Sequence, residues 1–363
     1  MKKLIVSTLF TVFCICLVPV TGLPCTTFVL DNNGQPVYGK NMDSTPVTAY
    51  VFINKRGVEK TSMEVIVEPN SQKISWTSLY GSVTFNMFAR EMPFEGINEA
   101  GLFISIMGLK QETKYPSPDT RTPIYGFQWV QYQLDNYSTV DEVIASEEIM
   151  RILQSEPGVH FLVSDATGNC ASIEWLDGIM VCHSGQSMPH KVLANSTYDQ
   201  SVAFSKLFWA FDGFLPLPHP VFYRGSLLRF AIAADMIQTY DPQTSGPAVD
   251  YAFNILQDVE INSLTSSAMW SAVYDLFNKK IYFRTYNNNS IRWFDLSAFD
   301  FSCKTPVKVV DVQAELEGEI TESFINYTEA VSRELLESNF SYLSDGAIDY
   351  FASYPEKYTH CTE

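Results

Sequence analysis

Cys25 is the residue of this sequence best placed to do chemistry, provided that the chain is cut just before it. After a cut behind Pro24, Cys25 would be the first residue, with a free α-amine beside its own thiol. An α-amine has a pKa near ~8, so it can accept the thiol proton around neutral pH. Nucleophile and base would then come from one residue, and no histidine would be needed. The alternative is that Cys25 is only a thiol of the first strand, or that it forms a disulfide.

The sequence offers no other familiar catalytic system or cofactor site. The nucleotide fingerprints G-x-x-x-x-G-K-[ST] and G-x-G-x-x-G and the zincin motif H-E-x-x-H do not occur. No Ser-His-Asp triad or Cys-His dyad is evident. The histidines show no metal-ligand spacing, and we interpret them as surface or strand-edge side chains: His160, His183, His190, His219 and His360. We therefore expect no metal and no organic cofactor.

Residues 1–22 have the pattern of an export signal. Lys2 and Lys3 precede a nearly unbroken apolar run from Leu4 to Val20, and small residues at Val20-Thr21-Gly22 suit a signal peptidase. Leu23-Pro24 would remain as a short pro-segment, for which self-cleavage by Cys25 is the natural hypothesis. A retained anchor and a lipoprotein are the alternatives; the apolar run is a little short for a span, and Pro24 does not fit a lipobox. We expect a secreted or periplasmic protein with no stable membrane span.

The cysteine count fits that expectation. Removal of the signal leaves five of the seven cysteines, an odd number, so one thiol stays unpaired in an oxidising compartment. Cys170 and Cys182 flank a strand–turn–strand pattern and could pair. Cys303 and Cys361 could tie the tail to the body of the protein, which would leave Cys25 as the unpaired thiol.

The charge of the chain excludes several partners. Acidic residues outnumber basic ones by 41 to 24, for a net charge of −17, and there is no Lys/Arg block. Such a chain is a poor partner for nucleic acid or an anionic membrane. Between Asp311 and Glu363, 12 acidic residues face only Arg333 and Lys357, so this tail alone carries −10.

The elements that must position Cys25 are strands followed by helices. Alternating apolar and polar residues between turn residues predict strands over Thr26–Leu30, Pro36–Gly39, Tyr50–Asn54, Glu64–Glu68, Ile74–Phe88, Asn98–Leu109, Phe161–Ser164, Ala171–Trp175, Met180–His183, Lys191–Ala194, Trp270–Phe277, Lys280–Tyr286 and Ser290–Leu296. A hairpin turn at Asn32-Asn33-Gly34 joins the first two. Helical spacing of apolar residues predicts helices in Tyr125–Ile152, with a second start at Ser138, and in Arg229–Tyr240, Val249–Val259 and 312–340. Residues 199–222 are predicted as a loop. This order suits two sheets covered by helices.

The residues after Cys25 carry a family resemblance. Cys25-Thr26-Thr27-Phe28 is followed, 15 residues after Cys25, by Lys40 of the run Gly39-Lys40-Asn41-Met42-Asp43. This resembles the choloylglycine hydrolase and penicillin V acylase family of linear amide C–N hydrolases, N-terminal-nucleophile enzymes that open with Cys-Thr and continue with G-R-N-x-D. Further segments that resemble the family follow in the same order: Gly96–Leu102, His160–Glu174, Leu193–Ser196, Arg229-Phe230 and Val273–Leu296.

The resemblance implies an α+β fold of four layers, αββα, over residues 25–298, with 299–363 as an acidic helical extension that we could not match. By the same resemblance, Cys25 attacks the amide carbonyl, and Asp43 holds its amine by a charged hydrogen bond. Asn195 would donate to the oxyanion, and Arg229 would favour the thiolate. The alternatives are turn residues for Asp43 and Asn195 and, for Arg229, a surface arginine whose role falls to Arg224.

Two positions depart from the family pattern. Lys40, beside Asn41, replaces the arginine of G-R-N-x-D and offers a point charge where a planar fork is expected, which affects substrate carboxylate binding or the thiol. Gly108 or Met107 occupies the second oxyanion position, so only a backbone N–H is available there.

The implied activity is hydrolysis of a linear amide through a thioester acyl-enzyme, with a conjugated bile salt, a penicillin V-type amide or another N-acyl amide as substrate. Side chains on segments that could face the nucleophile suit an apolar acyl group, although ordinary packing explains each one alone: Phe88, Met92, Phe94, Phe103, Met107, Phe204, Phe208, Trp209, Phe211 and Phe214. The alternatives are an N-acyltransferase and a non-catalytic secreted protein that binds an apolar ligand. Self-association into a homo-oligomer stays open.

Overall fold

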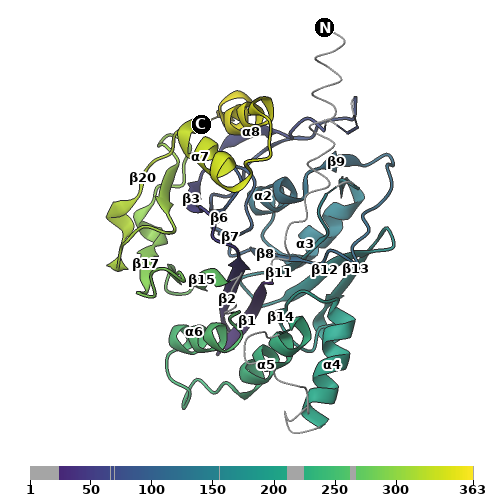
Figure 1. The fold of residues 1–363 in the computed structure, drawn as a ribbon, viewed down its shortest axis with the longest axis vertical. Helices are drawn as coiled ribbons and strands as arrows, with labels where there is room; N and C mark the ends of the chain where they lie inside the picture. The colour runs from purple at the N-terminus through teal and green to yellow at the C-terminus, as the bar shows by residue number, and fades with distance from the viewer. Residues whose placement is uncertain are drawn as a thin grey trace.

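The computed structural model describes residues 24–362, except 66, 69, 155, 211–224 and 262–266. The predicted signal segment and residues 211–222 of the predicted loop therefore lie outside the described residues. In the described part, two large sheets lie face to face between two groups of helices, which is the expected four-layer α+β sandwich (Figure 1).

The first sheet has seven strands in the order β14 (Val192–Leu193), β1 (Thr26–Asn32), β2 (Gln35–Ser44), β15 (Ser267–Asp275), β16 (Lys280–Arg284), β17 (Arg292–Asp295) and β19 (Gly318–Glu319). Neighbours pair antiparallel, apart from the parallel pair β17–β19. The β1–β2 hairpin turns at Asn33 (φ +54°) and Gly34 (φ +78°), the two positive values that a two-residue hairpin loop requires. The predicted turn is thus confirmed, and it places the start of β1 beside the end of β2 in the middle of the sheet.

The second sheet has nine antiparallel strands in the order β13 (Ile179–Ser184), β12 (Cys170–Leu176), β11 (Val159–Ser164), β8 (Phe103–Gly108), β7 (Glu95–Asn98), β6 (Ser82–Asn86), β3 (Tyr50–Asn54), β18 (Lys308–Asp311) and β20 (Ile325–Asn326). Smaller sheets join β4 (Val58–Thr61) to β5 (Ser75–Thr77) and β21 (Thr359–Cys361), and β9 (Thr122–Ile124) to β10 (Met150–Ile152). The predicted strand at Glu64–Glu68 is wrong, because its described residues form no ladder.

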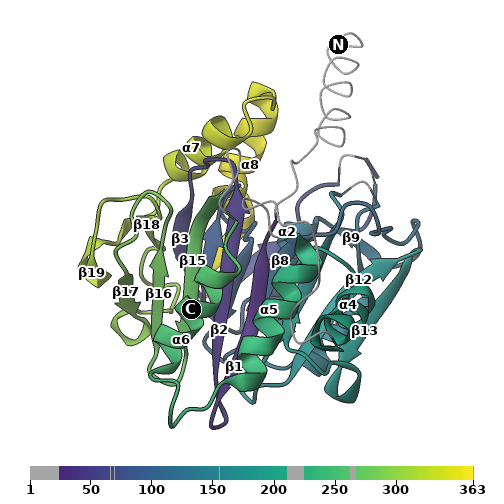
Figure 2. The same cartoon turned by 60° about the horizontal axis from the view of Figure 1, so that its bottom comes forward.

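Helices cover the outer face of each sheet. Helices α5 (Ser226–Thr239) and α6 (Ala248–Asp258) pack on β1 and β2, in front of them in Figure 2, and α4 (Tyr198–Ala210) packs on α5. The nine-stranded sheet is covered by α2 (Gly126–Asn136), α3 (Val140–Ala145), α7 (Glu329–Asn339) and α8 (Asp345–Tyr358). Aromatic side chains from both sheets meet in the core between them, as where Phe85 stacks on Trp270 and Phe103 on Tyr38.

Three helix predictions need correction. Residues 198–210, predicted mostly as loop, form α4, because the Pro-rich run begins only at Leu215. The helix expected over 312–340 is confined to α7, because Gly318 takes φ +68° and Ile320 enters the core from an irregular segment. Helix α3 begins after Thr139 rather than at Ser138, because the Thr139 hydroxyl accepts the Glu142 N–H in a capping box.

The acidic tail packs into the fold instead of standing apart from it. Strand β18 pairs with β3 at the edge of the nine-stranded sheet, and Val331 and Leu335 of α7 pack with Phe52. A boundary at residue 298 stays a prediction, but the structure joins the segment after it to the same sheet. Neither β18 nor α8 was foreseen in the sequence.

One of the two cysteine pairings is confirmed. Cys303 and Cys361 form a disulfide that closes 58 residues of chain. Cys170 and Cys182 are free thiols, because the β12–β13 register sets Cys182 opposite Ile173 instead of Cys170. The predicted pairing of these two is therefore wrong.

Removal of the Cys303–Cys361 disulfide is expected to destabilise the tail. Closing a loop of this length restricts the unfolded chain by about 4 kcal/mol in the loop-entropy model. A Cys303→Ala/Cys361→Ala variant should therefore lose up to that much free energy of unfolding in a denaturant titration. A Cys182→Ala variant is the matched control, since Cys182 is half-buried and unbonded; an equal loss in both would contradict the prediction.

Candidate active site

Cys25 lies immediately before β1 and is fully buried. Thr26 pairs with Asn41 and Thr27 with Lys40 across β1–β2, so Cys25 comes next to Met42, whose Sδ is 3.4 Å from Sγ. Side chains alternate between the two faces of a strand. Because the Lys40 amine reaches the Ile106 carbonyl of the other sheet, Cys25, Met42 and Lys40 share the face between the sheets.

The surroundings of Cys25 shift the pKa of its thiol in both directions. Burial raises its pKa, and the Asp43 carboxylate raises it further. The charges of Lys40 and Arg229 and the backbone N–H of Asp43 act in the opposite direction. In this form of the chain, with Pro24 still attached, burial has the larger effect, so the sulfur carries its proton.

Asp43 is a fully buried carboxyl at the end of β2. Neither of its oxygens has a hydrogen-bond partner in the part of the chain that the structure describes. Burial raises its pKa to about 7, and the charge of Glu260 adds to the shift. The charges of Arg229 and Lys40 and the dipole of the Ile261 N–H oppose it. An unpartnered buried carboxyl is costly, so this position is suited to receive a cation or a donor.

Arg229 of α5 joins Cys25 to Asn195. One guanidinium nitrogen, Nη1, donates to the Cys25 carbonyl at 2.5 Å and also to Thr26 Oγ1, and Nη2 donates to Asn195 Oδ1 at 2.7 Å. The Asn195 Nδ2 donates in turn to the Gly108 carbonyl at 2.9 Å. The structure therefore brings together four of the predicted site residues. Cys25 comes from the segment just before β1, Arg229 from α5, Asn195 from the loop after β14 and Gly108 from the end of β8.

Sequence reasoning missed the groups that hold Asn195 in place. His160 was expected at the surface or a strand edge, but it is fully buried in β11, with Nδ1 2.8 Å from Glu174 Oε1 and Nε2 2.7 Å from the Ala194 carbonyl. Glu174 also accepts the Tyr198 N–H, and Ser226 Oγ accepts the Asn195 N–H at 2.8 Å. His160 and Glu174 lie on the paired strands β11 and β12, which the hairpin pattern could have indicated.

Asn41 lies on the opposite face of β2 from Lys40. Its Nδ2 donates to the Leu256 carbonyl of α6 and its Oδ1 accepts from Ser271 Oγ, both at 2.7 Å. Asn41 thus ties β2 to α6 and β15, and a direct contact of Asn41 or Lys40 with substrate stays a prediction. Arg224, the alternative to Arg229, lies outside the described residues.

Several of the aromatic side chains considered for a substrate pocket have packing roles. Phe88 packs on Phe340 and Phe351 beneath the C-terminal helices, and Phe94 packs on Phe127 of α2. Phe211 and Phe214 lie outside the described residues. Packing therefore explains Phe88 and Phe94, as the alternative interpretation held.

Within the described ranges, no helix is long and apolar enough to cross a bilayer. Among the same residues, no group of three or more His, Cys, Asp or Glu side chains is arranged to hold a metal ion.

The four-layer fold, together with the contacts that join Cys25, Arg229 and Asn195, is typical of an amide hydrolase. Residues 25–309 match the linear amide C–N hydrolases of the choloylglycine hydrolase family, and the chain belongs to that family. It is a hydrolase that acts on linear carbon–nitrogen amide bonds. The family membership expected from the Cys25 and Gly39–Asp43 motifs is thereby confirmed.

Individual proteins of known name resemble this chain in sequence and in structure. The chain is 28% identical over 329 residues to penicillin V acylase of Pectobacterium atrosepticum, a match that covers 77% of this chain and 83% of the relative. The structure of penicillin V acylase from Agrobacterium tumefaciens superposes with a TM-score of 0.71 at 28% identity, over 84% of this chain and 98% of that one. A variant of conjugated bile acid hydrolase from Clostridium perfringens shares the fold at 20% identity, with a TM-score of 0.65, over 79% of this chain and 96% of that one.

Proposed function

We propose that the mature protein begins at Cys25 and hydrolyses N-acyl amides of the penicillin V type through a thioester on that residue. The single observation that carries this proposal is the pair of unpartnered, buried Asp43 oxygens beside Cys25, among the residues described. While Pro24 is attached, residue 25 has an amide nitrogen and no charge. Once the Pro24–Cys25 bond is cut, the new α-ammonium is a cation that Asp43 can bind, and the buried carboxyl gains its partner.

The reaction follows from these groups. The α-amine takes the thiol proton, and the sulfur attacks the amide carbonyl carbon to form a tetrahedral oxyanion. The carbon–nitrogen bond then breaks, the leaving amine takes the proton from the α-ammonium, and the acyl group remains as a thioester. Water, deprotonated by the same amine, attacks the thioester; the acid leaves and the thiol returns.

In this proposal Asn195 stabilises the oxyanion. Its Oδ1 is bound by Arg229, which fixes the orientation of the amide. Its Nδ2 donates to the Gly108 carbonyl. In the processed enzyme the same NH2 group, which carries two hydrogens, would also donate to the substrate oxygen. A backbone N–H near Gly108 would donate to the same oxygen. Preorganised donors of this kind lower the barrier because they need no reorientation during the reaction.

The substrate class rests on the two relatives at 28% identity, both named penicillin V acylase. The bile acid hydrolase at 20% identity supports the fold alone. We therefore propose an aryloxyacetyl or similarly apolar acyl amide. We also propose that residues 1–22 direct export and are cleaved, and that Leu23-Pro24 are removed afterwards by Cys25 itself.

The test is a direct comparison of substrates on the processed protein. Penicillin V, glycocholate and taurocholate are incubated separately, and the released amine is quantified by liquid chromatography. We expect the highest kcat/KM for penicillin V. Release from neither substrate class, with Cys25 shown to be residue one, would overturn the proposed activity. Formation of an N-acyl product when a second amine is added would identify an acyltransferase instead.

The unpartnered Asp43 predicts a pH-dependent stability of the unprocessed form. Its folded-state pKa of about 7 lies above the ordinary aspartate value of 3.8, so the folded chain binds more protons between these two values. The free energy of unfolding should therefore fall as the pH rises from about 4 to 7, by at most about 4 kcal/mol. The stabilisation that protonated Asp43 contributes is fully present below about pH 4 and is lost above about pH 7.

Urea titrations of a Cys25→Ala chain that retains Leu23-Pro24 measure this effect. In that background an Asp43→Asn substitution should flatten the pH dependence and stabilise the protein at neutral pH, because it removes a buried charge without changing the shape of the side chain. Asp165→Asn serves as the control for a buried aspartate whose Oδ1 is already bound by Thr167. A slope that Asp43→Asn leaves unchanged would contradict the prediction.

A further inference from the structure

A cavity of about 650 Å³ lies at the end of the sandwich away from Cys25. It is lined by the tip of the β1–β2 hairpin at Gly34–Pro36, by the β15–β16 turn at Leu276–Lys279, and by the β7–β8 turn at Glu99–Gly101. Cys25 precedes the other end of β1, seven strand residues away. At about 3.3 Å per residue this separates the cavity from the thiol by more than 20 Å, so the cavity is not part of the proposed active site.

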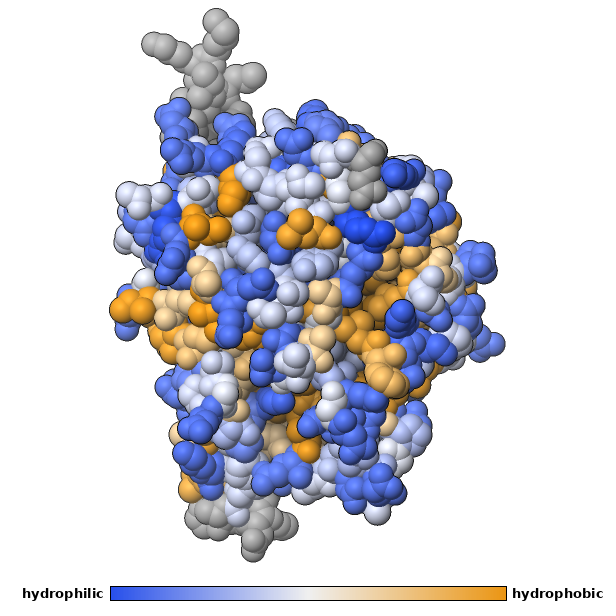
Figure 3. Space-filling view, turned by 180° about the vertical axis from the view of Figure 1, so that it is seen from behind, coloured by the Kyte–Doolittle hydropathy of each residue, from blue (hydrophilic) through white to orange (hydrophobic). Residues whose placement is uncertain are grey.

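Part of the cavity wall is apolar and partly exposed. Phe277, Phe299 and Phe301 line it together with Ile97 and Leu296, and 65% of the Phe277 surface is open to solvent. Figure 3 shows the molecule from behind, with hydrophobic residues gathered in a band across its middle. The two sheets lie at the same height in Figure 1. An exposed aromatic beside a cavity of this size is typical of a site for a small molecule.

The acidic groups around the cavity already have partners. Glu99 binds Arg56 at 2.6 Å and the Gly81 N–H at 2.8 Å. Asp300 accepts the N–H and the hydroxyl of Ser302, and Asp295, just beyond the rim, accepts both from Ser297. These carboxylates are therefore satisfied, and the Arg56 charge is balanced by Glu99.

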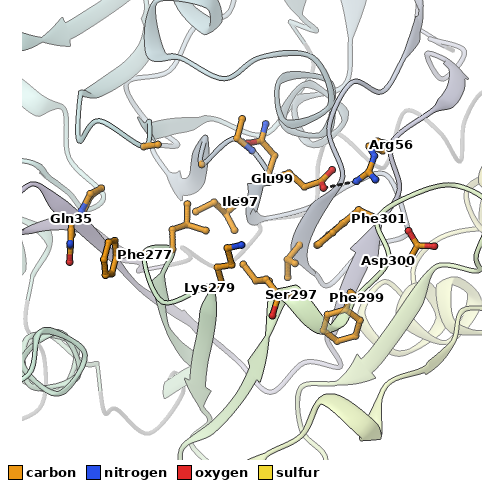
Figure 4. A pocket seen from close by; sticks show the side chains of 18 of the residues that line it. Gln35, Arg56, Ile97, Glu99, Phe277, Lys279, Ser297, Phe299, Asp300 and Phe301 are labelled. Atoms are coloured by element: carbon orange, nitrogen blue, oxygen red, sulfur yellow. Dashed lines mark hydrogen bonds and ion pairs between the residues drawn. The ribbon is translucent and has the colours of Figure 1, made fainter.

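Lys279 is the cation that remains. Its amine has no hydrogen bond and no ion pair among the residues described. Its charge lowers the pKa of Asp295 only slightly, by less than the Ser297 hydrogen bonds and the Lys280 charge do. In Figure 4 the amine lies in the middle of the lining side chains, between Phe277 on one side and Phe301 on the other. The backbone of Lys279 takes φ +54°, a strained conformation for a residue other than glycine, asparagine or aspartate.

We propose that this cavity is a second small-molecule site, which binds a long-chain alkyl carboxylate. The Lys279 ammonium would pair with the carboxylate, and Phe277, Phe299 and Phe301 would enclose the chain. The charge of the exposed Lys279 disfavours a cation, and a neutral alkane would leave that ammonium bound to water alone. The proposal does not depend on the activity at Cys25.

Isothermal titration of the purified protein with dodecanoate tests this site. We expect saturable binding that Lys279→Met weakens about tenfold, the effect of losing one charge-assisted contact, and that Phe277→Ser weakens further. Lys280→Met is the matched control, because the neighbouring Lys280 amine lies over the Trp293 ring, 4.0 Å from its centroid. Dodecyltrimethylammonium, of equal chain length and opposite charge, should not bind.

A Lys279→Gly variant separates binding from folding, because glycine suits φ +54° and should leave the unfolding temperature unchanged or higher while binding weakens about as much as in Lys279→Met. Dodecanoate binding that Lys279→Met leaves unchanged would place the ligand elsewhere, at the active site for example, and would overturn the proposal. Equal binding of the ammonium probe, or self-association that Phe277→Ser abolishes in sedimentation, would assign the face to nonspecific contact or to a second copy and would also overturn it.

Discussion

Replacing Cys25 by alanine is expected to abolish hydrolysis of penicillin V, with kcat reduced by at least about 10⁴-fold. In the proposed mechanism the Cys25 sulfur forms the acyl-enzyme, and the alanine side chain offers no replacement for it. Cys25→Ser should retain a small residual rate, because its hydroxyl is a weaker nucleophile than a thiol activated by the same amine. Initial rates of amine release on fully folded protein measure the effect.

The control is supplied by the other unbonded cysteines of the described chain. Cys170 is buried and Cys182 is half-buried, and neither contacts the Arg229–Asn195 chain. Cys170→Ala and Cys182→Ala should keep kcat within about twofold, even where burial of Cys170 lowers the stability. If the alanine variant of Cys25 kept its activity, or if either control lost it, Cys25 would not be the nucleophile.

Replacing Asn195 by alanine is expected to lower kcat by about 10²- to 10³-fold, the usual effect of removing one oxyanion donor. KM should change little, because the contact forms mainly in the transition state. The substitution also removes the 2.7 Å contact between Arg229 and Asn195 Oδ1. We therefore expect some loss of stability, which a melting curve measures separately from the rate.

Ser196→Ala is the matched control for Asn195→Ala. The Ser196 hydroxyl binds Ser226 Oγ at 2.9 Å and lies in the same loop, so its loss tests the loop rather than the oxyanion contact. Asn195→Ala and Ser196→Ala should then differ by about a hundredfold or more in kcat. Similar small effects in both would show that Asn195 acts only in folding.

The parts of the fold that follow from local pattern were predictable from the sequence. Asn33-Gly34 dictates a two-residue hairpin, and that hairpin alone brings the end of β2, with Asp43, beside Cys25. The family motifs located Asn195 and Arg229. Their contact could not be predicted, because it depends on how α5 packs against β1, which is a tertiary property.

The errors share a physical cause. Residues 312–328 have helical spacing of apolar side chains, yet Ile320 and Phe324 reach the core from irregular backbone once Gly318 interrupts the helix. His160 looked like an edge residue, because the sequence does not show that Glu174 and the Ala194 carbonyl meet its ring inside the protein. In both cases tertiary contacts outweigh local propensity.

The most direct test of the account is the N-terminal sequence and intact mass of the protein recovered after expression of residues 1–363, measured beside a Cys25→Ala variant. We predict that the wild-type chain begins at Cys25 and that the variant retains Leu23-Pro24. The α-amine that serves as base would then exist, and Cys25 would be responsible for exposing it. A wild-type protein that begins at Leu23 and still hydrolyses penicillin V would contradict the account, because no free amine would be present on residue 25.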